Sequence, residues 1–249
     1  MSFDLKLHAY RLLMDEPFFA ALSRKIEKRA TTAIPTAGVC VNEQTGHFEM
    51  IYNPEFFASL PKEQVLGVLK HEYFHLIFEH CTSRRPVGVP HKTWNIAADL
   101  AINSHLVGEL PEFACMPGVG PFEELPAGMT AEWYLNNITD DQVDQCDGGE
   151  GEGQPGQPGV LDDHSGWSEE GDSEAQQAAN QMAKERLKQS LKEAAKEASQ
   201  SAKGWGSVSA GLKKEIIKRL ETKVDWRKVM RYFIKTSQRA NRSSTLKRI

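Results

Sequence analysis

The sequence predicts an α+β fold that is mainly helical, with one small antiparallel β-sheet and a helical C-terminal region. Its 249 residues are 40% hydrophobic and 26% charged, an ordinary composition for a globular protein with one sizeable core. Segments 37–42 and 47–53 are rich in Val, Ile, Tyr and Phe, and the turn between them contains Gly46, so they are expected to form a hairpin. Apolar residues recur at helical spacing in 3–14, in 17–28 and after Pro61.

Composition divides the chain into three regions. Residues 1–140 have regular apolar patterning and hold seven of the eight histidines, so they are expected to form one folded unit. Residues 141–173 are acidic and rich in Gly and Pro, and a segment that buries so little apolar surface is expected to be a flexible linker. Residues 174–249 are expected to be helical and basic. Within them we expect 174–203 to be a largely solvent-facing helix, and 211–249 carry thirteen Lys or Arg against three acids.

Charge and cysteine content limit the functional classes. The net charge of −4 gives no overall attraction to nucleic acid, and the basic residues of the tail alternate with apolar ones at helical spacing, so nucleic-acid binding is disfavoured. The sequence has no long apolar run and no secretory signal, so we expect no membrane segment and a cytoplasmic location. The four cysteines are scattered without a CxxC pair, which favours buried thiols over disulfides or zinc ligands: Cys40, Cys81, Cys115 and Cys146.

The helix that Pro61 opens carries an HExxH motif, His71-Glu72-Tyr73-Phe74-His75. At about 100° per residue, His71 and His75 lie roughly 40° apart on one helix face, so both can reach a single ion. Neutral imidazoles suit zinc, and Glu72 beside them can take a proton from a metal-bound water. The motif therefore predicts a zinc site with both histidines as ligands and Glu72 as general base. Two histidines with structural hydrogen bonds are the alternative interpretation.

Three residues are candidates for a third zinc ligand: His80, Asp99 and His105. On a continuous helix His80 lies roughly 140° around the axis from His75, which is out of reach of the same ion. Residues 76–79 contain no glycine that would end the helix between them. We therefore expect His80 to have a structural role or to support a ligand from behind.

Asp99 is the preferred third ligand. It belongs to 94–103, an apolar helical segment on which Asn95, Asp99 and Asn103 form a polar stripe that needs buried partners. The separation from His75 leaves room for one loop and an antiparallel return of this helix against the first. The alternative is that Asp99 only orients one of the two histidines through its distal ring nitrogen.

Five stretches of the chain occur together in one known family: Pro17-Phe18-Phe19, Tyr52-Asn53-Pro54-Glu55-Phe56, the HExxH segment with His80 and Arg84, the segment 94–103, and Val224-Asp225-Trp226-Arg227. In these stretches the chain resembles a metallopeptidase domain family of bacteria and phages. Members of that family often precede a von Willebrand A-like domain and are encoded beside MoxR-type AAA+ ATPases. The resemblance implies a zincin-like fold, zinc at His71 and His75, Glu72 as catalytic base, and a MoxR-type AAA+ ATPase as partner.

Motif and resemblance together predict a zinc-dependent metallopeptidase that hydrolyses bonds in a peptide or protein substrate. Residues 47–53 are expected to align an extended substrate by strand addition. The alternative is a non-catalytic, metal-binding interaction or adaptor protein that works with a partner such as an AAA+ ATPase. Both bind metal, so turnover separates them. Five residues are candidates for stabilising an oxyanion, and the sequence does not rank them: Arg84, Arg85, His91, His105 and His164.

Overall fold

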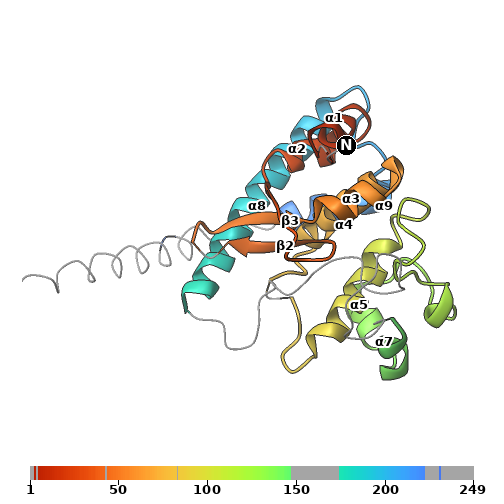
Figure 1. Cartoon of the computed structure of the whole chain (residues 1–249). Helices are drawn as coiled ribbons and strands as arrows, with labels where there is room; N and C mark the ends of the chain where they lie inside the picture. Colours follow the sequence, from red (N-terminus) through yellow and green to blue (C-terminus); the bar gives the residue numbers. More distant parts are fainter. Residues whose placement is uncertain are drawn as a thin grey trace, which may run out of the picture.

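The computed structural model describes residues 3, 5–42, 44–82, 84–146, 174–221 and 230. They form a mainly helical α+β fold with one three-stranded sheet, so the predicted class is confirmed (Figure 1). Among the described helices none is long and apolar enough to cross a membrane. In chain order the elements are α1 (Leu5–Asp15), α2 (Pro17–Ser23), β1 (Glu27–Ala30), β2 (Ala37–Asn42), β3 (His47–Tyr52), α3 (Pro54–Ser59), α4 (Lys62–Ile77), α5 (His91–Asn103), the 3-10 helix η1 (Gly120–Phe122), α6 (Ala131–Leu135), α7 (Asp140–Cys146), α8 (Glu174–Gln200) and α9 (Ala210–Glu221).

The sheet has the strand order β1-β3-β2. β2 and β3 form the predicted antiparallel hairpin, with Asn42 opposite His47. Gly46 in its turn adopts φ 60°, a left-handed conformation that glycine reaches without strain. β1 pairs with β3 in parallel, so the sheet is mixed, and the predicted antiparallel pairing applies to β2 and β3. Because β3 is paired on both sides, it offers no open edge for the strand addition expected at residues 47–53.

β1 begins within the segment 17–28, which was predicted to be helical. Helix α2 ends at Ser23 instead of continuing to Lys28, and all of its residues are buried. The charged residues that follow lie along an open edge of the sheet and are mostly exposed. Charged side chains are common on edge strands because they disfavour pairing with a further strand. Arg29 of β1 forms an ion pair with Glu49 of β3, which adds a side-chain link to the backbone pairing.

Helices α4 and α5 form the centre of the hydrophobic core. Every residue from Gly67 to Ile77 is buried, as is every residue from Trp94 to Asn103. The loop after α5 crosses α4 in backbone contact, because a Cβ at Gly67 would lie 1.9 Å from the carbonyl oxygen of Glu109. Glycine at this position is therefore what allows the two segments to approach.

Helix α8 packs along α2 and the sheet, so the expectation of a largely solvent-facing helix is wrong for one face (Figure 1). That face is narrow and consists mainly of alanines. Alanine is only weakly hydrophobic, so the buried face was not recognised in the sequence, but its small side chain allows close contact between helices. Arg186 on α8 donates from Nη1 to the carbonyl oxygens of Thr45 (2.6 Å) and Gly46 (3.0 Å) in the hairpin turn. The buried stripe comprises Ala179, Ala183, Leu187, Leu191, Ala194 and Ala198.

The segment between α8 and α9 docks onto the N-terminal helices. Trp205 stacks on Phe18, with ring centroids 4.5 Å apart and an interplanar angle of 14°. The backbone N–H of Ser207 donates to Glu16 Oε2 at 2.8 Å. The segment between α8 and α9 is thereby held against α2 and the residue before it.

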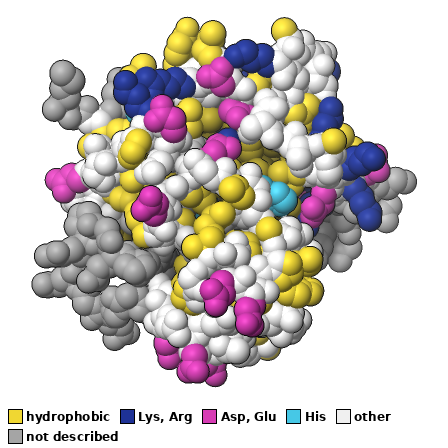
Figure 2. All heavy atoms as spheres, turned by 90° about the vertical axis from the view of Figure 1, so that its right-hand side faces the viewer, with side chains coloured by type: hydrophobic (Ala, Val, Ile, Leu, Met, Phe, Trp, Pro, Cys, Tyr) yellow, Lys and Arg dark blue, Asp and Glu magenta, His cyan; other side chains and the backbone are white. Residues whose placement is uncertain are grey.

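Parts of the two charged regions lie outside the described residues. Helix α7 covers the first residues of the segment predicted to be a linker, and 147–173 are not described. Of the basic tail, the description covers 211–221 and Met230. Figure 2 shows one face of the molecule, on which the described lysine and arginine side chains lie in the upper half of the view and hydrophobic side chains occupy much of the middle. On this described face the basic groups do not form the continuous strip typical of nucleic-acid-binding surfaces.

Candidate metal centre

Three buried side chains from two helices meet at one point in the core. His71 and His75 project from α4, Asp99 projects from α5, and their ligand-type atoms all lie within 4.8 Å of one another. The two histidine Nε2 atoms are 2.9 Å apart. Asp99 Oδ1 lies 3.3 Å from His75 Nε2 and 3.8 Å from His71 Nε2. The structure thus brings together the three residues that the sequence predicted as ligands, and none of them is more than 1% exposed.

An antiparallel arrangement of α4 and α5 places these side chains. At the start of α5, Trp94 Nε1 donates to the carbonyl oxygen of His80, just beyond the end of α4, at 3.3 Å. At the end of α5, Asn103 reaches His71, one turn before His75. The two contacts show that α5 returns along α4 in the direction expected from the separation of the motifs.

Asn103 sets the orientation and tautomer of His71. Its side-chain Nδ2 donates to the carbonyl oxygen of Cys115 at 2.7 Å, so its Oδ1 faces His71 Nδ1 at 2.8 Å. An amide oxygen only accepts, and the proton of His71 is therefore on Nδ1. This leaves the lone pair of His71 Nε2 directed at His75 and Asp99, as in metal-binding histidines whose distal nitrogen is held by a neighbouring acceptor.

His80 approaches the site from behind His75, with the two Nδ1 atoms 3.3 Å apart. The expectation that α4 continues unbroken past His80 is wrong, because α4 ends at Ile77. After it, Glu79 adopts φ 60°. The backbone N–H of His80 donates to the carbonyl oxygen of His75 at 2.9 Å, and the backbone N–H of Glu79 donates to the carbonyl oxygen of Leu76 at 3.0 Å. These two bonds form a Schellman motif, which usually places glycine where Glu79 lies. His80 meets the distal nitrogen of His75, so it supports that ring from the side away from Asp99.

The three side chains fit a tetrahedral zinc ion. Ligand atoms about 2.0–2.1 Å from zinc at tetrahedral angles stand roughly 3.3 Å from one another. The observed separations of 2.9, 3.3 and 3.8 Å bracket that value. Two neutral imidazoles and one carboxylate are also a donor set that zinc accepts, and three protein ligands leave a fourth position for water or substrate. The site residues therefore suit a metal of this kind.

Glu72 follows His71 on α4 and is 0% exposed. Its side chain starts about 100° further round the helix axis than that of His71, at the margin of the face that carries both histidines. The neighbouring side chains of Tyr73 and Cys81 are also buried, and this burial raises the pKa of both groups, with a smaller contribution from the negative charge of Glu72. Electrostatic interactions are strong in such an environment.

Arg84, a candidate for oxyanion stabilisation, is engaged in a structural contact. Its Nε and Nη2 donate to the two carboxylate oxygens of Glu132 at 2.7 and 2.9 Å, and its Nη1 donates to the carbonyl oxygen of Phe78 at 2.8 Å. Although burial opposes the charged form, the hydrogen bonds from Arg84 hold the pKa of Glu132 below its ordinary value. Arg84 thus joins α6 to the end of α4.

The polar stripe on α5 extends one turn further than the sequence indicated. Asn95 Nδ2 lies 3.1 Å from His91 Nδ1, so His91, Asn95, Asp99 and Asn103 follow each other at four-residue intervals. The stripe was visible from Asn95 onward, and the same spacing applied backwards would have included His91.

Of the other oxyanion candidates, Arg85 is half-buried and His164 lies outside the described residues.

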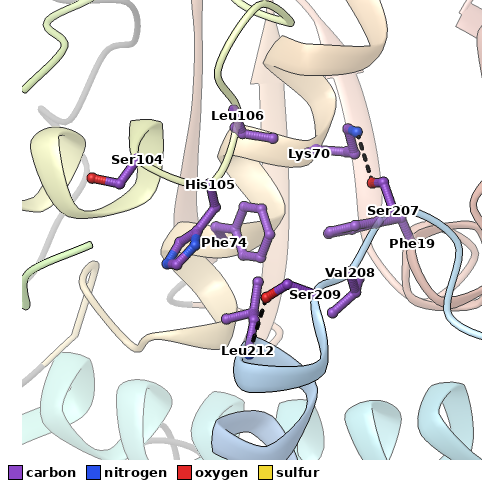
Figure 3. A pocket seen from close by; sticks show the side chains of 10 residues that line it. All are labelled: Phe19, Lys70, Phe74, Ser104, His105, Leu106, Ser207, Val208, Ser209 and Leu212. Carbon is purple, nitrogen blue, oxygen red and sulfur yellow. Dashed lines mark hydrogen bonds between the residues drawn. The ribbon is translucent and has the colours of Figure 1, made fainter. Parts of the chain in front are cut away.

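A cavity of about 200 Å³ lies between α4, the end of α5 and the segment leading into α9 (Figure 3). At one end Lys70 Nζ donates to Ser207 Oγ at 3.2 Å and to Glu16 Oε1 at 3.3 Å. His105 lies at this cavity, away from the metal group, and burial lowers its pKa. The cavity is therefore separate from the metal group and is lined by Phe19, Lys70, Phe74, Ser104, His105, Leu106, Ser207, Val208, Ser209 and Leu212.

Two buried histidines of an HExxH helix, joined by a buried aspartate of the neighbouring helix, form the kind of metal group found in metallopeptidases. The chain belongs to the family described as "Putative metallopeptidase domain", which matches residues 2–248. A protein of Thermotoga maritima described as uncharacterized is 33% identical over 70 residues, which is 28% of this chain and 17% of that relative, so the match spans a small part of the relative's length. No solved structure matches the chain significantly.

Proposed function

We propose that this protein is a zinc-dependent peptidase in which His71, His75 and Asp99 hold the ion and Glu72 is the general base. The observation that carries the proposal is that three buried ligand atoms, two from α4 and one from α5, meet beside a glutamate of α4. Zinc bound there would supply Lewis-acid polarisation of a carbonyl group and an acidified water.

The residues of the chain supply position and proton transfer. Asn103 keeps the proton of His71 on Nδ1, and His80 holds the ring of His75, so both Nε2 atoms are presented without rearrangement. The carboxylate of Glu72 accepts a proton from the attacking water and passes it to the nitrogen of the leaving amine. Exclusion of bulk water from this part of the core strengthens each of these interactions.

The test compares cleavage of an unfolded protein or a peptide library by the purified chain and by Glu72→Gln, with the zinc content of both measured. We expect cleavage by the wild-type chain and loss of cleavage in the variant, with zinc retained. Glu63→Gln is the matched control, because Glu63 is an exposed acid in the first turn of the same helix. Equal cleavage by wild type and Glu72→Gln would refute the role of Glu72.

A second candidate function is a metal-binding interaction protein without turnover. The observation that favours it is the burial of the whole group, since a peptide bond must reach side chains that are at most 1% exposed. On this proposal a partner, for which the family resemblance suggests a MoxR-type AAA+ ATPase, binds the chain or opens it. Stoichiometric zinc without cleavage of any peptide in the library, with and without a purified ATPase of that type, would favour this function over the first.

A further inference from the structure

Two cysteines that are far apart in the sequence lie in contact in the fold. The Sγ atoms of Cys115 and Cys146 are 3.1 Å apart across a separation of 31 residues. Both side chains are 6% exposed. Cys115 lies in the loop after α5, and Cys146 is the last residue of α7. Their spacing in the sequence matches no thiol motif, so this pair is a result of the fold.

We propose that Cys115 and Cys146 are a reversible disulfide site that takes hydrogen peroxide as oxidant, and that closing the disulfide loosens the metal centre. The thiolate of one cysteine attacks a peroxide oxygen, the O–O bond breaks, and hydroxide leaves as a sulfenic acid forms. The second thiol then attacks that sulfur, the S–S bond forms, and water is released. Peroxide is reduced to water while the two thiols are oxidised to one disulfide.

The geometry requires only a small movement. A disulfide bond is about 2.05 Å long, so the sulfur atoms must approach by about 1 Å. Cys115 lies in the loop between α5 and η1, where no helical hydrogen bonds hold its backbone, so closing the gap draws this loop toward Cys146 on α7. Earlier in α7, Val143 is buried and Gln142 Nε2 donates to the carbonyl oxygen of Pro121 at 2.7 Å, which keeps Cys146 beside Cys115.

The same loop residue also supports a metal ligand. The carbonyl oxygen of Cys115 accepts the hydrogen bond from Asn103 Nδ2 at 2.7 Å, and Asn103 Oδ1 accepts from His71 Nδ1 at 2.8 Å. Both distances lie at the short end of the range for N–H···O hydrogen bonds, so a shift of the Cys115 backbone toward Cys146 lengthens the bond from Asn103 or pulls Asn103 away from His71. This second half of the proposal rests on the proposed function, because it assumes that His71 binds zinc. The disulfide itself does not.

The other cysteines provide a comparison within the chain. Burial raises the pKa of the Cys81 thiol well above its ordinary value, and a thiol held in its protonated form reacts slowly with peroxide. Cys40 is half-buried on β2 and is not part of the pair, so Cys40→Ser is the matched control. Cys146→Ser removes one sulfur and leaves the carbonyl oxygen of Cys115 in place.

The experiment treats the purified full chain with hydrogen peroxide, alkylates the remaining thiols, and maps disulfides by mass spectrometry of the digested protein. We expect one intramolecular link between Cys115 and Cys146 that dithiothreitol reverses. Zinc affinity, measured by competition with a chelator, should fall about tenfold or more on oxidation, as for loss of other groups that orient a metal ligand. Cys146→Ser should bind zinc as the reduced wild type does, before and after peroxide, whereas Cys40→Ser should still respond.

Each outcome decides one part of the proposal. Absence of the Cys115–Cys146 link after peroxide overturns the modification site. A link that leaves zinc affinity unchanged overturns the coupling to His71. If the reduced chain binds no zinc, the proposed function fails, and the coupling is then read from the ring nitrogen resonances of His71 by NMR. Those resonances should shift on oxidation in wild type and stay fixed in Cys146→Ser.

Discussion

Replacement of Asn103 by leucine tests whether the hydrogen bonds behind His71 maintain the metal centre. The side chain is 0% exposed and makes two hydrogen bonds, to His71 at 2.8 Å and to Cys115 at 2.7 Å. Leucine is close to asparagine in shape, so Asn103→Leu removes both bonds without opening a large cavity. The Nδ1–H of His71 and the carbonyl oxygen of Cys115 are then buried without their partner.

The magnitude follows from these two groups. A buried polar group left without its partner costs about 1–3 kcal/mol, so the free energy of unfolding should fall by roughly 2–6 kcal/mol in Asn103→Leu. Zinc affinity should fall about 10- to 100-fold, because the ring of His71 is no longer held in one orientation and one tautomer. Asn103→Asp keeps an acceptor for His71 Nδ1, so it should retain more zinc affinity than Asn103→Leu.

The assay is zinc affinity by chelator competition, read beside a thermal unfolding curve of each variant. Asn95→Leu is the matched control, since Asn95 lies on the same stripe of α5 and its hydrogen bond goes to His91. The Asn95→Leu variant should differ from the wild type in zinc affinity by no more than a few-fold. Wild-type zinc affinity in a folded Asn103→Leu protein would refute the reasoning, as would equal losses in Asn103→Leu and Asn95→Leu.

Three further predictions follow from other contacts. Asp99→Asn removes a charged oxygen 3.3 Å from His75 and should abolish tight zinc binding, whereas His80→Ala, behind that ring, should cost about 10- to 100-fold; chelator competition that ranks them in the opposite order would make His80 the ligand. Gly67→Ala should lower the melting temperature, since its Cβ would lie 1.9 Å from a carbonyl oxygen of the facing loop, while alanine at an open helix position would raise it. The hydrogen bonds from Arg84 hold the pKa of Glu132 below its ordinary value of 4.5. The pair therefore stabilises the fold above pH 4.5, and this contribution is lost as the pH falls through the lowered pKa. Denaturant titration should show that Glu132→Gln loses less stability on acidification than the wild type does.

Local patterns in the sequence were sufficient for the elements that carry the chemistry. Val, Ile and aromatic residues on either side of Gly46 predicted the hairpin, because β-propensity and turn chemistry depend on residues close together in the chain. The four-residue spacing of His71 and His75 predicted a shared helix face for the same reason. Asp99 was preferred as third ligand from the stripe on 94–103 and the room for an antiparallel return, and the structure places it beside both histidines.

Elements whose neighbours are distant in the chain were decided by packing. Residues 17–28 have helical spacing, yet the last two of them belong to strand β1, because an edge of β3 is available for pairing. The alanine stripe of α8 became buried because α2 lies against it. The end of α4 at Ile77 was also invisible, since the residue that adopts φ 60° there is Glu79 and not the glycine that usually marks such a stop.

The sequence by itself determined that this protein has an α+β fold and a helix with two histidines and a glutamate suited to a metal. Those properties follow from the periodicity of the backbone, which each segment has on its own. Only the tertiary structure decided that the carbonyl oxygen of Cys115 holds Asn103, that Asn103 holds His71, and that two thiols meet at 3.1 Å. These contacts join residues that no spacing rule relates, because they depend on how the loop after α5 and helix α7 pack around the core.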